Sequence, residues 1–171
     1  MARLLIKSLL SSKFPLVVRC FSSLEPNVLR TGDILRQTRI YSSEDVLEYS
    51  KVSQDSNPLH FDPESARTAG FDDPIVHGML VAALFPRIIS SHFPGAVYVS
   101  QSLHFRLPVY IGDKILGEVQ ALNIREIKKK YLVKFSTKCV KNGEILVLDG
   151  EAMTILPTLA VDEEQSTIDR N

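Results

Sequence analysis

The chain of 171 residues has few of the features that mark several protein classes. It contains two cysteines and no tryptophan, so it cannot build a disulfide framework or a cysteine-based zinc site. No apolar run reaches the roughly 18 residues that a membrane-spanning helix requires. The formal net charge is zero, which argues against binding of nucleic acid through overall charge. What remains is the composition of one ordinary globular domain.

Acidic residues are missing from the first 24 positions, where four basic residues and five serines occur. This composition is typical of a mitochondrial or plastid transit peptide, and the segment Arg19-Cys20-Phe21-Ser22 is similar to a matrix processing site. Cleavage after Phe21 would leave 16 basic and 20 acidic residues. We therefore predict a transit peptide over residues 1–21 and a location in the mitochondrial matrix, with a plain basic tail as the alternative.

The rest of the chain predicts one α+β domain over residues 22–157, followed by a polar, loose tail over 158–171. Short helices are expected before Asp55 and after Asp62 because capping residues and acids open both segments. The most apolar stretch, 75–92, predicts a long helix buried on most sides, which Pro86 bends or divides. A short leading segment and four strands are expected at 28–41, 97–107, 114–126, 131–140 and 144–156. Such an order predicts an antiparallel sheet wrapped around the long helix, with a hairpin tip at 128–130.

The segment Asp55-Ser56-Asn57-Pro58-Leu59-His60 contains the residues best suited to chemistry. A carboxylate and an imidazole five positions apart on a proline-stiffened turn can converge on one small group and move protons near neutral pH. Asn57 can brace the turn through its side chain. A structural turn or a structural histidine has the same pattern, so the spacing alone leaves both alternatives open. A calcium loop is a poor fit, because Pro58 interrupts it and Ala66 stands where a bidentate glutamate belongs.

Three motifs together resemble the MaoC-like family of (R)-specific enoyl-CoA hydratases and 3-hydroxyacyl-thioester dehydratases. They are YSKVSQDSNPLHFDPESA at 49–66, PIVHGML at 74–80 and QSLHFRLPV at 101–109, and the similarity extends to the Gly-Asp pair at 112–113. It covers about residues 30–157. The resemblance implies a hot-dog fold, a homodimer, an acyl thioester substrate, and no metal or other cofactor.

The resemblance also implies roles for individual residues. The family's catalytic Asp and His fall on Asp55 and His60, and its backbone oxyanion donor falls on Gly78. The position of Gly78 in the first turn of the long helix supports that role, since N–H groups there lack intrahelical partners. Two departures occur: Gln54 replaces the usual Gly before the Asp, and Pro86 replaces a Ser of some members, which leaves the orientation of Asp55 open.

The expected reaction is the reversible syn elimination of water from a (3R)-3-hydroxyacyl thioester, within fatty acid synthesis on acyl carrier protein. Asp55 and His60 share the two proton transfers, in an order that the sequence leaves open. The alternatives are hydration of enoyl-CoA, a hot-dog thioesterase that needs no His60, and a silent acyl-binding protein. A basic cluster at Arg125 and 128–130 is either a contact for an acidic carrier or a solvated hairpin tip.

Two further residues have a structural interpretation. His77 is expected to hold the start of the long helix through a side-chain hydrogen bond. Cys139 alternates with apolar residues on a strand and is expected to be a buried hydrophobic residue and no nucleophile.

Overall fold

The computed structural model describes residues 27–161, and the predicted transit peptide lies outside the described residues. Its helical elements are α1 (Ser43–Ser53), η1 (Pro58–His60), α2 (Pro63–Thr68), α3 (Gly78–Ala82) and α4 (Leu84–His92). Its strands are β1 (Asn27–Val28), β2 (Ile34–Ile40), β3 (Val97–Phe105), β4 (Lys114–Ile127), β5 (Lys130–Lys141), β6 (Ile145–Leu156) and β7 (Ala160–Val161). Among these residues, no helix is long and apolar enough to cross a membrane.

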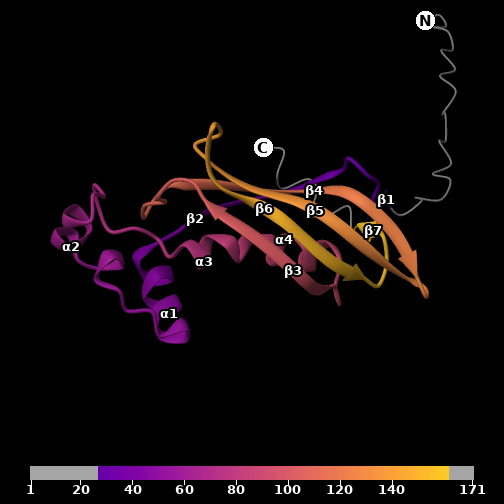
Figure 1. Ribbon diagram of the computed structural model, residues 1–171, viewed down its shortest axis with the longest axis horizontal. Helices are drawn as coiled ribbons and strands as arrows, with labels where there is room; N and C mark the ends of the chain where they lie inside the picture. Colours follow the sequence, from indigo (N-terminus) through magenta and orange to yellow (C-terminus); the bar gives the residue numbers. More distant parts are fainter. Residues whose placement is uncertain (1–26, 162–171) are drawn as a thin grey trace, which may run out of the picture.

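Five antiparallel strands form one sheet in the order β2-β4-β5-β6-β3, and α4 lies against its inner face (Figure 1). The helix presents Leu84, Phe85, Ile88 and Ile89 to the sheet, and these side chains are almost fully buried. Gly117 on β4 allows this close approach, because a Cβ there would lie 2.6 Å from Leu84 Cδ2. The sheet wrapped around a helix confirms the architecture predicted from the sequence.

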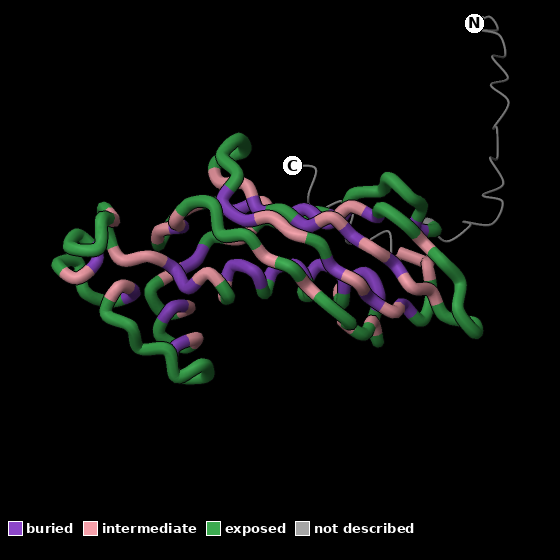
Figure 2. The backbone as a smooth tube through the Cα atoms, viewed as in Figure 1, coloured by how far each residue is buried: buried purple, intermediate pink, exposed green. Residues whose placement is uncertain are grey.

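The long apolar stretch is less helical and less buried than predicted. Residues 75–77 are not helical: Ile75 pairs with Tyr110 in an isolated bridge, and Val76 N–H donates to Val109 O at 2.7 Å. The helix α4 is also exposed on one side, where Pro86, Arg87 and Ser90 lie (Figure 2). One continuous apolar stretch can therefore form an extended segment followed by a helix that is buried on one side only. Apolar composition alone does not show where the first ends and the second begins.

The predicted effect of Pro86 is confirmed. The helix is interrupted at Ala83, between α3 and α4, because Pro86 has no N–H to donate to the carbonyl one turn earlier. The α-helical pattern resumes with Arg87 N–H, which donates to Ala83 O at 3.3 Å.

The four predicted strands are present within two residues of their expected limits, and Lys128 and Lys129 form the tip between β4 and β5 with positive φ angles. Two expectations were incomplete. The leading segment contains the seven-residue edge strand β2, which periodicity did not reveal because only Leu35 on it is buried. The tail is not loose from its start, since Ala160–Val161 pairs with Asn27–Val28.

Candidate active site

Asp55 lies at the sharp turn where α1 ends. Gln54 caps α1 in the left-handed conformation, with φ 59°, which turns the chain away from the helix axis. This conformation explains why a Gly is usual here, because a side chain makes it costly. Asn57 then braces the turn as predicted: its Oδ1 accepts from Leu59 N–H at 3.2 Å, and its own N–H donates to Asp55 Oδ1 at 3.2 Å.

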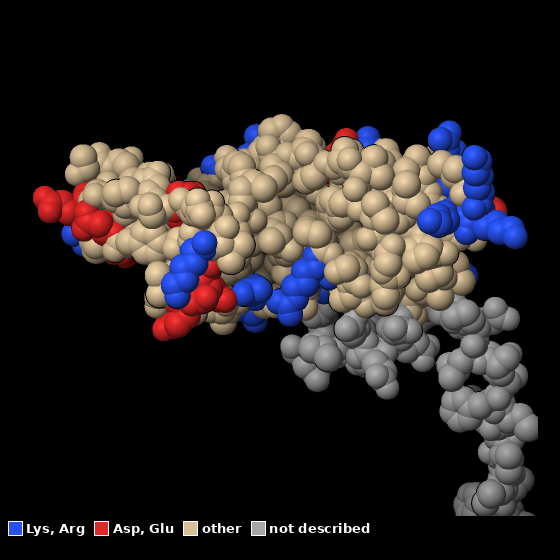
Figure 3. Space-filling model, turned by 90° about the horizontal axis from the view of Figure 1, so that it is seen from below, with Lys and Arg blue, Asp and Glu red and all other residues tan. Residues whose placement is uncertain are grey.

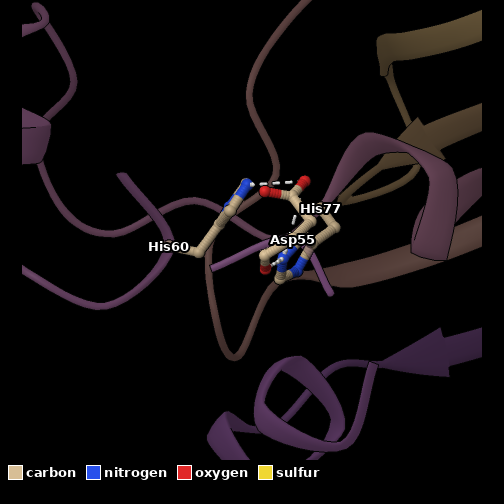
Figure 4. Close-up of side chains that lie close together, drawn as sticks. All are labelled: Asp55, His60 and His77. Atoms are coloured by element: carbon tan, nitrogen blue, oxygen red, sulfur yellow. Dashed lines mark hydrogen bonds and ion pairs between the residues drawn. The ribbon is translucent and has the colours of Figure 1, made fainter. Parts of the chain in front are cut away.

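His60 ends the short helix η1 and is buried, with 8% of its surface exposed. Its Nδ1 lies 2.7 Å from Ile75 O, and a carbonyl oxygen can only accept, so Nδ1 carries the hydrogen. Nε2 is thereby left to exchange protons, and it lies 3.8 Å from Asp55 Oδ2 (Figure 4). The structure therefore brings together the two residues that the sequence selected as an acid–base pair.

His77 lies against the same pair and was not assigned to the site from the sequence. Its Nε2 lies 3.0 Å from the backbone oxygen of Asp55, and its ring stacks on the His60 ring with centroids 3.6 Å apart (Figure 4). The prediction that it holds the helix start was wrong: His77 is the N-cap of α3 but makes no side-chain capping bond. The turn around Asp55 is its partner, which local spacing could not show because 22 positions separate the two residues.

Asp55, His60 and His77 are residue types that ligate metals, and their polar atoms lie within 4.8 Å of one another. Their arrangement suits proton transfer better than coordination. The two rings are stacked nearly parallel, at 25°, and His60 Nδ1 is occupied by Ile75 O. His77 Nε2 is also engaged with the Asp55 carbonyl, which needs the hydrogen that a metal would displace.

A cavity of about 490 Å³ opens beside the pair and includes Asp55, His60, His77 and Gly78 in its wall. Most of the remaining wall is apolar, with Phe105 and Leu107 at the end of β3 and beyond it. Such a cavity suits a ligand with a long apolar part and one polar group near the catalytic pair.

Gly78 lies in the first turn of the helix, as predicted, and is in fact its first residue; the described hydrogen bonds include none donated by its N–H. The ring of Phe105 covers its Cα: a Cβ would lie 2.6 Å from Phe105 Cε1. The close contact with Phe105 therefore requires glycine at this position. The absence of a side chain also allows a ligand to approach the Gly78 N–H.

Two remaining expectations concern Pro86 and Cys139. Pro86 is exposed on α4 and is not among the residues of the cavity wall, and the hydrogen bonds of Asp55 among the described residues are to its own turn and to His77. Cys139 is fully buried, and burial raises the pKa of its thiol to about 12, in agreement with a structural role.

A family model described as "MaoC like domain" matches residues 28–142, which is more than half of the chain. The chain belongs to the MaoC-like family. The resemblance seen in the three sequence motifs is therefore confirmed.

Two relatives bear the name mitochondrial 3-hydroxyacyl-(acyl-carrier-protein) dehydratase. The Arabidopsis thaliana protein is 67% identical over 146 residues, which is 84% of this chain and 88% of the relative. The Solanum lycopersicum protein is 57% identical over 159 residues, which is 93% and 94% respectively. The solved (R)-hydratase of A. caviae, involved in PHA biosynthesis, is 37% identical with a TM-score of 0.70 and covers 75% of this chain and 98% of its own. The fold is therefore the hot-dog fold.

Proposed function

We propose that this protein is a (3R)-3-hydroxyacyl-acyl-carrier-protein dehydratase of mitochondrial fatty acid synthesis. The observation that carries the proposal is the convergence of Asp55 and His60 at the mouth of an apolar cavity. The names of the two relatives at 67% and 57% identity specify the reaction and the organelle. The related activity, hydration of the enoyl thioester, is the same reaction in reverse and uses the same groups.

The elimination needs a group that takes the α-proton and a group that protonates the leaving hydroxyl. The Asp55–His60 pair performs both steps when it holds one exchangeable proton. One partner accepts the α-proton while the other delivers its proton to the hydroxyl, which leaves as water. Because His60 Nδ1 is committed to Ile75 O, the proton that His60 exchanges is on Nε2, the atom that faces Asp55.

The developing negative charge on the thioester oxygen is stabilised by the Gly78 N–H. This donor lies in the cavity wall next to His77 and has no intramolecular partner among the described hydrogen bonds. A preorganised donor of this kind contributes about 2.7–4 kcal/mol to the transition state. The acyl chain extends along the apolar wall formed in part by Phe105 and Leu107.

The active protein is a homodimer paired along β3. This strand is an edge of the sheet, and it exposes apolar side chains at Val97, Val99 and Phe105, each more than half exposed. A long, apolar edge strand of this kind is a template for pairing with another strand. Antiparallel pairing of two β3 strands would reverse the long axis of the second copy.

Charge supports this arrangement. One group of Lys and Arg lies at the end of the molecule that carries the β4–β5 hairpin, whereas most of the Asp and Glu in view lie at the end that carries α1 and α2, with some Lys and Arg beside them (Figure 3). Reversal of the long axis brings the basic end of one copy toward the acidic end of the other. The same arrangement carries the hairpin lysines toward the partner's cavity, where an acidic carrier would deliver its substrate.

The dimer is tested by Val99→Lys, which places a charge on the edge strand. Light scattering of the purified protein should give a dimer mass, and the variant should give a monomer mass at the same concentration. Val52→Lys, at a side chain that is 85% exposed on α1, is the matched control and should remain dimeric. A monomeric parent protein would refute the dimer.

The activity is tested with (3R)- and (3S)-3-hydroxyacyl groups attached either to acyl carrier protein or to CoA. The absorbance of the conjugated enoyl thioester reports elimination, and a thiol reagent reports hydrolysis. The expected result is elimination from the (3R) substrates, with the higher kcat/KM on the carrier. Thiol release without enoyl formation would support the thioesterase alternative instead.

Targeting is tested separately. A fusion of residues 1–30 to a fluorescent reporter should enter mitochondria, and mass spectrometry of the native protein should place its N-terminus near Ser22. A cytosolic, peroxisomal or secreted reporter would refute the transit peptide.

A further inference from the structure

His77 is the most buried polar group at the site, with 2% of its surface exposed. It contacts both members of the acid–base pair and directly precedes Gly78. We propose that His77 is a positioning residue, which holds Asp55 and His60 in reacting geometry as a neutral imidazole with its hydrogen on Nε2. The inference rests on the proposed dehydratase function for its effect on turnover, while the arrangement itself can be observed without substrate.

The first contact is the hydrogen bond from His77 Nε2 to the backbone oxygen of Asp55, at 3.0 Å. Because that oxygen can only accept, the hydrogen of His77 is on Nε2. The opposite nitrogen, Nδ1, is buried and has no partner among the described residues, so no acceptor there would receive a second ring hydrogen. The other hydrogen bonds of Asp55 are to Ser53 and Asn57, within its own turn. Among the described residues, the bond from His77 is therefore the hydrogen bond that joins Asp55 itself to a residue outside its own turn.

The second contact is the stack between the two imidazoles, with centroids 3.6 Å apart and planes at 25°. The His77 ring also packs against the Tyr49 ring of α1, and the two ring centroids are 5.0 Å apart. A ring held in this way restricts rotation of His60, whose Nδ1 is anchored to Ile75 O. His60 Nε2 is consequently kept toward Asp55. A neutral neighbour also avoids placing a second positive charge against His60 when His60 carries the exchanged proton.

The two histidines have opposite tautomers as a result. His60 carries its hydrogen on Nδ1, and His77 carries its hydrogen on Nε2. One consequence is geometric: His77 and Gly78 are consecutive, so the same anchor places the acid–base pair and the N–H donor in one rigid unit. Displacement of reacting groups by about 1 Å can cost on the order of 10²-fold in rate.

Two variants separate the contacts of His77. His77→Phe keeps a stacked ring and removes the donor, while His77→Gln keeps an amide donor that can reach the position of Nε2 and removes the ring. We expect His77→Phe to lower kcat by about 10- to 100-fold with KM changed less than about two-fold. His77→Gln should restore kcat to within about five-fold of the parent, because it restores the bond to Asp55 O. A kcat for His77→Phe within two-fold of the parent would overturn the proposal, as would a loss that follows only the unfolded fraction.

The tautomers are measured directly on the unmodified full chain, which contains four histidines. Long-range ¹H–¹⁵N correlation spectra of protein labelled with ¹⁵N-histidine distinguish protonated from unprotonated ring nitrogens. Spectra of His77→Phe and His60→Gln assign the two rings. We expect a protonated Nε2 and a bare Nδ1 for His77, with the reverse pattern for neutral His60.

The spectrum tests the positioning role of His77, the activity assay tests the proposed dehydratase function, and either can be refuted without the other. A His77 with its hydrogen on Nδ1, or doubly protonated at neutral pH, would overturn the positioning role even if dehydration is observed. The expected tautomers in a protein that dehydrates no 3-hydroxyacyl thioester would refute the proposed function and leave the arrangement of the rings intact.

Discussion

The sheet with α4 and the end of the molecule that carries Asp55 are held together by different kinds of contact. In the sheet, side chains such as Phe135, Val133 and Ile115 are fully buried and packed across regular strand pairs. Around Asp55, residues 51–58 are exposed, and single hydrogen bonds from Asn57 and His77 hold the turn. The first region stabilises the fold, and the second places a few polar groups, two of them buried histidines, beside an exposed turn. Substitutions should therefore affect stability in one region and turnover in the other.

The largest effect on stability is expected in the sheet. Phe135→Ala should lower the free energy of unfolding by about 3–5 kcal/mol, because it removes a fully buried ring and leaves a cavity. Denaturant unfolding measures the loss, and Val52→Ala, at an exposed side chain, should change stability by less than about 0.5 kcal/mol. Phe135 is not part of the cavity wall, so kcat per folded molecule should stay close to that of the parent. A large fall in kcat of the folded variant would contradict the separation of the two regions.

At the catalytic end, Gly78→Val should lower kcat by about 10²–10³, since the thioester oxygen loses its close approach to the Gly78 N–H. KM should change less, because the charge on that oxygen is greater in the transition state.

The control for this variant addresses Phe105, whose ring a new side chain at Gly78 would displace. In a Phe105→Ala background that ring is absent, and the effect of Gly78→Val is measured against Phe105→Ala alone. Persistence of the loss places it at the N–H. Recovery would mean that displacement of Phe105 caused the loss, which would contradict the role of Gly78 as oxyanion donor.

The smallest effect is expected at Gln54. Gln54→Gly should raise the free energy of unfolding by about 0.5–1 kcal/mol, because it relieves a left-handed conformation at some cost in the entropy of the unfolded chain. Gln54→Ala retains a Cβ and should give no such gain. Thermal unfolding of both variants distinguishes the outcomes, and equal stability of the two would show that the turn is not strained.

The same contrast explains how much the sequence could predict. Alternation and turn residues identified the four long strands, because a strand with one buried face repeats every two residues. Capping residues located α1 and α2, since the signals for helix ends are local. Strand β2 was missed because it lies at the sheet edge with a single buried side chain, and residues 75–77 were assigned to a helix because apolar composition does not distinguish extended chain from helix.

For the site, Asp55 and His60 were identified because both lie on one short turn and because the motif around them resembles the MaoC-like family, since the spacing alone left a structural turn open. The role of His77 was not, because it depends on a contact across 22 positions and on the stacking of two rings. The only signal in the sequence was its position next to Gly78. Contacts of this kind are set by tertiary packing, and no local pattern encodes them.

The account is tested most directly by the turnover of Asp55→Asn and His60→Gln on a (3R)-3-hydroxyacyl-acyl-carrier-protein substrate, with unfolding measured in parallel. Each substitution removes one proton-transferring group while keeping the size of the side chain, so kcat should fall by about 10²–10⁴. Stability should change little, because neither residue belongs to the hydrophobic core. Near-normal turnover in either folded variant would contradict the acid–base pair, and a loss confined to Asp55→Asn would favour the thioesterase reaction.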